Sequence, residues 1–141
     1  MESPRVSRLA SLLHPPSCRS DASREAWENS DAAREIHDRR SWQKATLLAW
    51  VLMPDHWHGL IELGEGESLS ELMRRFKANV SRRLRSQSQG LGPVWAKSFH
   101  DRALRRDEDE VAVARYIVLN PVRAGLARGV GDYPFWNAVW L

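Results

Sequence analysis

Two short apolar runs decide the fold of this chain: TLLAWVLM at residues 46–53 and HWHGLIEL at residues 56–63, separated by Pro54-Asp55. Each run has the length of a β-strand, and Pro followed by Asp is a signal that stops a strand and turns the chain. The two runs therefore predict an antiparallel hairpin.

The second run begins with His56-Trp57-His58. Side chains alternate across a strand, so the two imidazoles project from one face, about 6 to 7 Å apart along the chain. That separation lets both reach one metal ion. Pairs of histidines at this spacing also occur by chance, so a further residue must complete the site.

A helix follows the hairpin. Ser68 and Glu71 form an S-x-x-E capping box. Apolar residues then recur at helical spacing: Leu69, Leu72, Met73, Phe76, Val80 and Leu84. The other faces of this helix carry cations: Arg74, Arg75, Lys77, Arg82 and Arg83. The pattern predicts an amphipathic helix that buries one stripe and presents a basic surface.

The C-terminal third predicts a strand and a helix. Residues 94–104 have the length and mixed apolar character of a strand. Four carboxylates at 107–110 suit the N-terminus of a helix, because the helix dipole favours acids there. We expect this helix to end near Asn120, because Pro121 disfavours helical geometry at the preceding residue. The aromatic tail, residues 131–141, is expected to pack back on the domain.

The N-terminal region gives weaker signals. Residues 1–20 contain three prolines and several serines without periodicity, which predicts a loose arm. Residues 21–40 are polar and rich in Ala, Glu and Arg, which favours a surface helix. We therefore predict an arm at 1–20 and one globular domain at 21–141, a size that supports a real core.

Composition narrows the class of protein. No run approaches the roughly 18 to 20 apolar residues that span a bilayer. The single Cys18 cannot form an internal disulfide or a cysteine zinc cluster, so we expect a soluble cytoplasmic protein whose metal ligands are His, carboxylate or amide groups. Residues 71–106 hold 10 basic and 2 acidic side chains, whereas the flanking segments are net acidic. This basic third indicates either a solvated helix face or a polyanion partner.

Tyr116 and Asn120 lie four residues apart on the predicted last helix, and hence on one face. A helix packed across the histidine strand would bring both to the imidazoles. The Asn120 amide oxygen is a candidate third ligand, and two histidines with one oxygen suit Mg²⁺ or Mn²⁺. A tyrosine phenol can serve as a nucleophile when a nearby cation helps it ionise. Taken singly, Tyr116 could equally be a core aromatic, and Asn120 an ordinary helix end.

Four segments together resemble a known family: WVLMPDHWH at 50–58, Phe76-Lys77, Phe99-His100-Asp101-Arg102, and YIVLNPVRAGL at 116–126. The sequence is similar to the REP-associated tyrosine transposases, relatives of the single-tyrosine HUH transposases, from about residue 45 to the end. The resemblance implies a ferredoxin-like α+β sandwich, with an antiparallel sheet and helices on one face. It also implies that His56 and His58 bind the metal, with Asn120 as third ligand.

In the family, the tyrosine corresponding to Tyr116 cleaves single-stranded DNA through a 5′-phosphotyrosine intermediate. The partners implied are REP-type palindromes folded as single-stranded hairpins at the bacterial nucleoid, bound by a monomer or a homodimer. Backbone contacts are expected from the basic helix at 74–83 and from Lys97, Arg102 and Arg105. Trp95 could stack on a base, but we expect it to occupy a core position.

The N-terminus departs from the family pattern. Family members begin with an alternating strand beside the histidine strand, and residues 5–13 are only a weak candidate for it. Without that strand, the histidine strand lacks a partner for its backbone groups. We hypothesise either a substitute strand or a truncated, inactive copy with a degenerate or missing first strand. Pairing of residues 5–13 with 56–63 would exclude the truncated copy.

Two other functions stay open at this point. A catalytically inactive DNA-binding module would keep the basic helix and would not need Tyr116. A metal-dependent phosphodiesterase that uses activated water would need the histidines but form no covalent intermediate. Zinc deamination is disfavoured because its H-x-E and P-C-x-x-C elements are missing.

Overall fold

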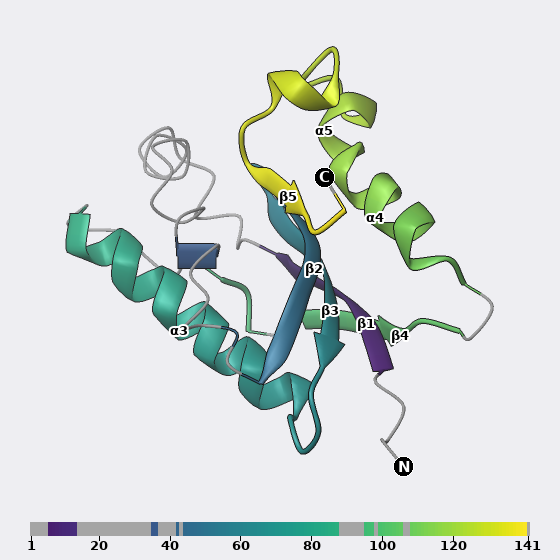
Figure 1. The fold of residues 1–141 in the computed structure, drawn as a ribbon. Helices are drawn as coiled ribbons and strands as arrows, with labels where there is room; N and C mark the ends of the chain where they lie inside the picture. The colour runs from purple at the N-terminus through teal and green to yellow at the C-terminus, as the bar shows by residue number, and fades with distance from the viewer. Residues whose placement is uncertain are drawn as a thin grey trace.

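The computed structural model describes residues 6–13, 35–36, 42, 44–87, 95–97, 99–105 and 108–140. In this part of the chain one antiparallel sheet has the order β4-β1-β3-β2-β5, and helices pack on it (Figure 1). The strands are β1 (Val6–Leu13), β2 (Ala45–Leu52), β3 (His56–Leu63), β4 (Phe99–Ala103) and β5 (Trp136–Ala138). The helices are α3 (Leu69–Gln87), α4 (Glu110–Val118) and α5 (Asn120–Arg123), with a 3-10 turn at Val130–Asp132. The predicted α+β fold with an antiparallel sheet is confirmed.

The hairpin of β2 and β3 lies at the centre of the sheet, as the two apolar runs predict. β3 has the predicted bounds, and β2 begins one residue earlier than expected. The Met53 amide donates to the His56 carbonyl over 2.7 Å, which closes the turn around Pro54-Asp55. A register shift between Leu47 and Ala49 marks a bulge in β2.

Both faces of this hairpin are buried, and a helix covers each. Trp50, Trp57 and Ile61 belong to the core cluster that contains the apolar stripe of α3. Val51 and Leu60 belong to a second cluster with Ala114, Ile117 and Val118 of α4. Figure 1 accordingly shows α3 on one side of the sheet and α4 on the other. The expectation that the helices share one face is wrong, because β2 is apolar at consecutive positions and so buries both its faces.

β1 corrects the expectation of a loose arm. Val6–Leu13 pairs with His56–Leu63 on one side and with residues of β4 on the other. Ala10 and Leu12 are fully buried against the α3 side, and the Ser7 hydroxyl donates to a Glu110 carboxylate oxygen over 2.6 Å. The strand expected beside β3 is therefore present, which excludes a copy truncated at this strand. Residues 1–5 and 14–20 of the predicted arm lie outside the described residues.

Of the remaining predictions, some agree with the structure and one lies largely outside the described residues. One of the two bonds of the predicted capping box is present: the Glu71 amide donates to the Ser68 hydroxyl over 3.5 Å at the start of α3. The strand expected at 94–104 is the shorter β4, and the tail packs back as expected, with β5 alongside β2. The surface helix predicted at 21–40 lies largely outside the described residues. None of the helices in the described part is long and apolar enough to cross a membrane.

Gly59 lets a large side chain lie flat on β3. The indole of Trp57, two residues before it on the same face, would stand 2.2 Å from a Cβ placed on Gly59. Trp57 also packs on Phe76 of α3, with ring centroids 4.6 Å apart. A residue with a side chain at position 59 would therefore displace the central aromatic contact between the sheet and α3.

Candidate metal and tyrosine site

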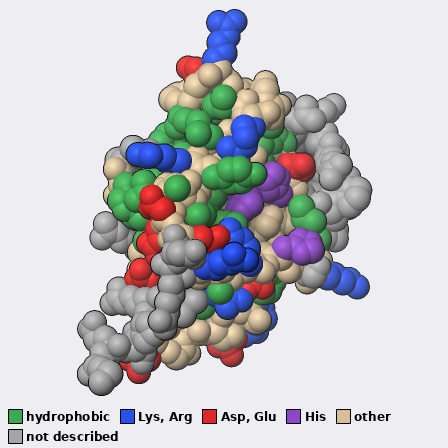
Figure 2. All heavy atoms as spheres, turned by 90° about the vertical axis from the view of Figure 1, so that its right-hand side faces the viewer, with side chains coloured by type: hydrophobic (Ala, Val, Ile, Leu, Met, Phe, Trp, Pro, Cys, Tyr) green, Lys and Arg blue, Asp and Glu red, His purple; other side chains and the backbone are tan. Residues whose placement is uncertain are grey.

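The two histidines of β3 lie on the α4 face of the sheet. His56 and His58 alternate with Trp57, which is buried on the α3 face, so both imidazoles point toward the side where Leu60 meets α4. Their ring centroids are 6.0 Å apart and the rings are inclined by 67°. Figure 2 shows histidine side chains at the surface of this face. The strand geometry predicted from the sequence thus brings the pair together on one surface.

Asp55 orients His56. Its carboxylate Oδ1 lies 2.7 Å from His56 Nδ1. An Nδ1–H donated to this carboxylate leaves the Nε2 lone pair free, and carboxylate partners of this kind commonly fix the tautomer of a metal-binding histidine. From the sequence Asp55 was predicted only as part of the turn, although its position directly before His56 was a usable signal for a role at the site.

Asn120 faces the free nitrogen of His56. Its amide Nδ2 lies 3.5 Å from His56 Nε2. Turning the amide about its last side-chain bond exchanges Oδ1 with Nδ2, which would present a carbonyl oxygen at the same place. The structure thus brings together His56, His58 and Asn120, the residues that the sequence indicated as ligands.

Asn120 lies on a different helix from the one predicted. α4 ends at Val118, Leu119 forms a turn, and Asn120 begins α5. Tyr116 and Asn120 therefore do not share one helix, which corrects the expectation. Pro121 has no N–H with which to continue α4, but it is well suited to the first turn of a new helix. The Ala124 amide accordingly donates to the Asn120 carbonyl over 2.9 Å.

Tyr116 projects from α4 into solvent. It is 59% exposed, so it is not a core aromatic. The Arg123 guanidinium carbon lies 3.8 Å from the centroid of the Tyr116 ring, and Arg123 Nη2 also donates to the Tyr116 carbonyl. The phenol is thus accessible and sits beneath a cation. Arg123 was not predicted from the sequence as a site residue; it lies seven residues after Tyr116, on α5, and its side chain reaches back to the tyrosine.

His58 is held in its neutral form. Burial, followed by the charges of His56 and Arg123, lowers the pKa of His58 from 6.5 to about 4. A neutral imidazole is the form that binds a metal ion, so His58 keeps its lone pair well below neutral pH. Arg123, which lies over the Tyr116 ring, is thus one of the charges that act on His58.

The donor set can hold a divalent cation with open positions. The amide oxygen suits Mg²⁺ or Mn²⁺, and the imidazole nitrogens are ligands to first-row divalent metals such as Mn²⁺. Among the described residues no group of three or more His, Cys, Asp or Glu side chains could hold a metal ion. Within the described residues, a metal held by the two histidines would take Asn120 as its third ligand, and water or substrate would fill the open positions.

Comparison with known proteins identifies the family. A family model described as IS200-like transposase matches residues 17–120. The chain belongs to the IS200-like transposase family. The match begins after β1 and ends at Asn120.

Relatives of this chain include a REP-associated tyrosine transposase of Escherichia coli K12. It is 33% identical over 88 residues, which are 62% of this chain and 50% of that protein. An uncharacterized protein of Haemophilus influenzae Rd is 25% identical over 95 residues, 52% of each protein. The chain thus spans about half the length of these curated relatives.

A solved structure of a REP-associated tyrosine transposase bound to a REP hairpin has the same fold. Its TM-score is 0.72 at 25% identity, and the match covers 96% of this chain and 82% of that one. The resemblance to this family is therefore confirmed at the level of sequence family and of fold.

The cations expected to contact DNA lie in two separate places on this chain. Arg74, Arg75, Lys77, Arg82 and Arg83 are on α3, on the sheet face opposite to the histidines. Arg102 is on β4, in register with Leu9, and therefore on the histidine face. It forms an ion pair with Glu108, with 2.9 Å to each carboxylate oxygen. Lys97 and Arg105 are exposed before and after β4.

His100 also shares the histidine face. It is in register with Ser11 of β1, which is in register with His58. The row His58–Ser11–His100 crosses two strand spacings, about 10 Å. Trp95, by contrast, is 9% exposed and belongs to the α3 core cluster, which confirms the interpretation of a core position.

Proposed function

We propose that this chain cleaves and rejoins single-stranded DNA at hairpins of the REP type, through a 5′-phosphotyrosine on Tyr116 and with Mg²⁺ or Mn²⁺. The observation that carries the proposal is that His56, His58 and Asn120 lie together on the side of the sheet that α4 covers. Tyr116 is exposed on that same helix. Arg123 joins the two parts, since it lies over the Tyr116 ring and acts on His58.

In the proposed reaction the Tyr116 phenolate oxygen attacks the scissile phosphorus, and the bond from phosphorus to the 3′-oxygen breaks. The phenol loses a proton and the departing 3′-oxygen gains one, so the DNA 5′ end is left as an ester of Tyr116. A 3′-hydroxyl can then attack that ester and restore the tyrosine, so rejoining needs no nucleotide cofactor. Arg123, a fixed cation beside the ring, would stabilise the negative phenolate.

His56, His58 and Asn120 would hold the cation, with Asp55 keeping His56 in the required tautomer. A divalent cation bound there would supply Lewis-acid polarisation of the scissile phosphate. The lowered pKa of His58 keeps that ligand unprotonated at neutral pH. The solvent exposure of Tyr116 fits a macromolecular substrate that approaches from outside.

Hairpin DNA is proposed because a structural relative at 25% identity was solved with a REP hairpin. The basic surface of α3 supports a polyanion partner. The ion-paired Arg102 on the histidine face is available to a strand that reaches Tyr116, at the expense of its contact with Glu108.

The test compares the two tyrosines of the chain, Tyr116 and Tyr133. Purified protein and the variants Tyr116→Phe and Tyr133→Phe are incubated with labelled REP-hairpin single-stranded DNA and Mg²⁺ or Mn²⁺, then separated by denaturing electrophoresis. Tyr133 is a matched control because its hydroxyl donates a hydrogen bond to the Leu52 carbonyl. We expect a protease-sensitive protein–DNA band from the wild type and Tyr133→Phe, and none from Tyr116→Phe.

Two results would contradict the proposal, and each would favour another function. Cleavage by Tyr116→Phe without a covalent band would indicate a phosphodiesterase that uses activated water. Hairpin binding by the wild type without cleavage, under several metals and DNA substrates, would indicate a DNA-binding module that lacks catalysis.

A further inference from the structure

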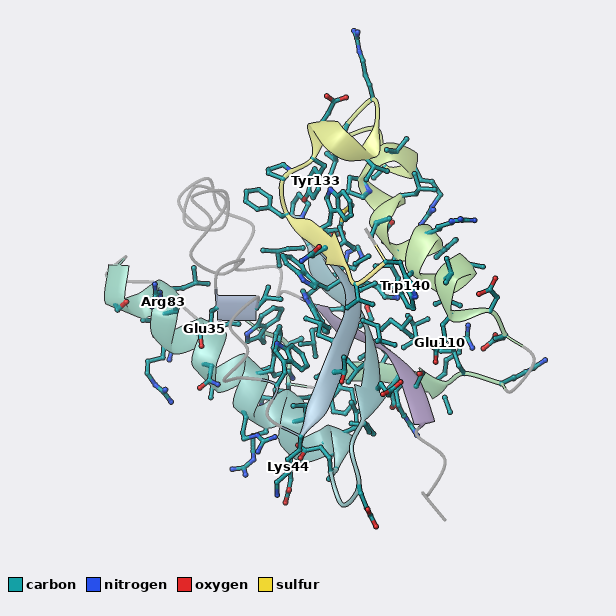
Figure 3. All side chains as sticks on the ribbon, viewed as in Figure 1. Glu35, Lys44, Arg83, Glu110, Tyr133 and Trp140 are labelled. Atoms are coloured by element: carbon teal, nitrogen blue, oxygen red, sulfur yellow. The ribbon has the colours of Figure 1, made fainter. Side chains whose placement is uncertain are left out.

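Ser7 of β1 contacts both ends of the segment that joins β4 to α4. Its hydroxyl donates to Glu110 Oε1 over 2.6 Å, and its carbonyl accepts from the Leu104 amide over 2.9 Å. Figure 3 shows Glu110 at the start of α4, on the side toward the sheet. We propose that Ser7 and Glu110 are a positioning pair, which fixes where α4 lies on the sheet and hence the distance from Tyr116 to the histidines. The reaction that the pair serves rests on the proposed function.

Apolar packing holds α4 on the sheet but gives it little direction. Ala114, Ile117 and Val118 of the helix are buried against Val51 and Leu60 of the sheet. Such contacts are non-directional, so they resist separation of the two layers more than a small slide or rotation of the helix. A hydrogen bond requires a particular distance and angle between its partners, so a bond from β1 to the first turn of α4 restricts both movements.

The pair contributes direction more than stability. Ser7 is 7% exposed, and a hydroxyl buried to this extent needs a hydrogen-bond partner. Its bond to a carboxylate oxygen belongs to the strong, charge-assisted class. Two apolar side chains of similar shape would fill the same space at little or no cost in stability. They would not supply a fixed distance between β1 and the first turn of α4.

The chain is tied to the sheet on both sides of Tyr116. Glu110 lies six residues before Tyr116, about 9 Å along the helix axis at 1.5 Å per residue. Asn120, four residues after it, has its amide nitrogen 3.5 Å from His56 Nε2. Tyr116 is 59% exposed, so its position follows from these two contacts rather than from burial of its own ring. A displacement of about 1 Å can slow a reaction roughly 100-fold, so a small shift of α4 is expected to lower the rate of attack.

The experiment removes both partners together, so that no buried polar group is left unpaired. A double variant that combines Ser7→Val with Glu110→Leu is compared with Glu110→Gln, which keeps an acceptor oxygen for Ser7. Glu71→Leu is the control, because it takes an exposed acid from the first turn of α3 in the same way. Each protein, in excess over labelled hairpin DNA and with Mn²⁺, is followed through a single turnover. The rate constant of covalent band formation, the half-saturating protein concentration and the reacted fraction of the DNA are measured.

We expect the double variant to form the covalent band tenfold or more slowly at saturating protein. Its half-saturating concentration, its reacted fraction and its unfolding temperature should stay close to those of the wild type. Glu110→Gln and Glu71→Leu should react within threefold of the wild-type rate. A merely structural contact would lower the reacted fraction or the unfolding temperature and leave the rate constant unchanged. That result, or a double variant that reacts within threefold of the wild type, would overturn the proposal.

A second measurement needs neither cleavage nor DNA. Fluorotyrosine is incorporated at the two tyrosines of the chain, Tyr116 and Tyr133. Cu²⁺, which imidazoles bind more tightly than Mn²⁺, is added as a paramagnetic probe. Bound Cu²⁺ broadens the fluorine NMR signal of each ring to a degree that falls steeply with distance from the metal. Tyr133 is the internal reference, because its hydroxyl donates to the Leu52 carbonyl of β2.

The ratio of the two broadenings should change by twofold or more in the double variant and stay at the wild-type value in Glu110→Gln. An unchanged ratio in the double variant would overturn the positioning pair, whether or not the wild type cleaves DNA. If the wild type forms no covalent band but the ratio changes as expected, the proposed reaction fails and the positioning pair stands. The two measurements therefore separate a failure of the reaction from a failure of the contact.

Discussion

The Arg123 guanidinium carbon lies 3.8 Å from the centroid of the Tyr116 ring, and the same side chain donates to the Tyr116 carbonyl. This contact fixes the orientation of the proposed nucleophile on an otherwise exposed helix face. It also places a positive charge where a phenolate would form.

Replacing Arg123 tests this contact. A cation–π interaction of about 1 kcal/mol corresponds to a roughly fivefold change in rate. We expect Arg123→Ala to slow formation of the covalent protein–DNA band by at least that factor, and Arg123→Lys to recover part of it, because lysine keeps the charge but loses the planar stack. Single-turnover kinetics with excess protein measure the effect. Equal rates for wild type and Arg123→Ala would show that Arg123 does not contribute to the reaction.

Asp55 should affect metal binding without contacting the metal. Losing the carboxylate that orients His56 is expected to weaken Mn²⁺ binding by about tenfold in Asp55→Ala, the lower end of the range for such partners. Titration calorimetry gives the affinity. Glu65→Ala, which removes an exposed carboxylate from the turn between β3 and α3, is the control and should bind Mn²⁺ like the wild type. A normal affinity in Asp55→Ala would show that its contact with His56 is incidental.

β1 should be essential to the domain. Leu12 is fully buried between the sheet and α3, whereas the adjacent Leu13 is 43% exposed. We expect Leu12→Ala to lower the free energy of unfolding by about 2 to 4 kcal/mol, and Leu13→Ala to change it by roughly 0.5 kcal/mol or less. Urea unfolding followed by tryptophan fluorescence measures both. Similar small effects would mean that β1 contributes little to the core.

The lowered pKa of His58 makes stability depend on pH. The unfolded chain takes up a proton at His58 near pH 6.5, whereas the folded protein does so only near pH 4. Protonation therefore favours unfolding, and the stability present above pH 6.5 is lost as the pH falls toward 4. Between pH 7 and pH 5, without metal, we expect a loss of about 1 to 2 kcal/mol that His58→Gln does not show. The same loss in His58→Gln would assign it to other groups.

The elements that could be predicted from sequence are those with local signals. β3 and the start of α3 were correctly placed because alternation and a capping box are properties of neighbouring residues. Consecutive apolar positions in β2 carried a further signal, burial on both faces, which predicts helices on both sides of the sheet.

The elements that were missed depend on distant partners. β1 contains Ser7, Arg8 and Ser11, which weaken any apolar alternation, and it is a strand because β3 and β4 flank it. Ser7 is buried because Glu110, over a hundred residues away, accepts its hydrogen bond (labelled in Figure 3). In the same way the histidines, Tyr116 and Asn120 were recognisable by residue type, whereas the role of Arg123 is visible only from its contact with the Tyr116 ring.

The most direct measurement is the identification of the residue that becomes linked to DNA. The covalent product is digested with nuclease and then trypsin, and the peptides are sequenced by mass spectrometry. Cleavage after Arg115 and Arg123 would release the peptide 116–123, and we predict that it carries a nucleotide 5′-phosphate on Tyr116. A nucleotide attached to any other residue, or a cleaved DNA without any linked peptide, would contradict the assignment of Tyr116 as the nucleophile.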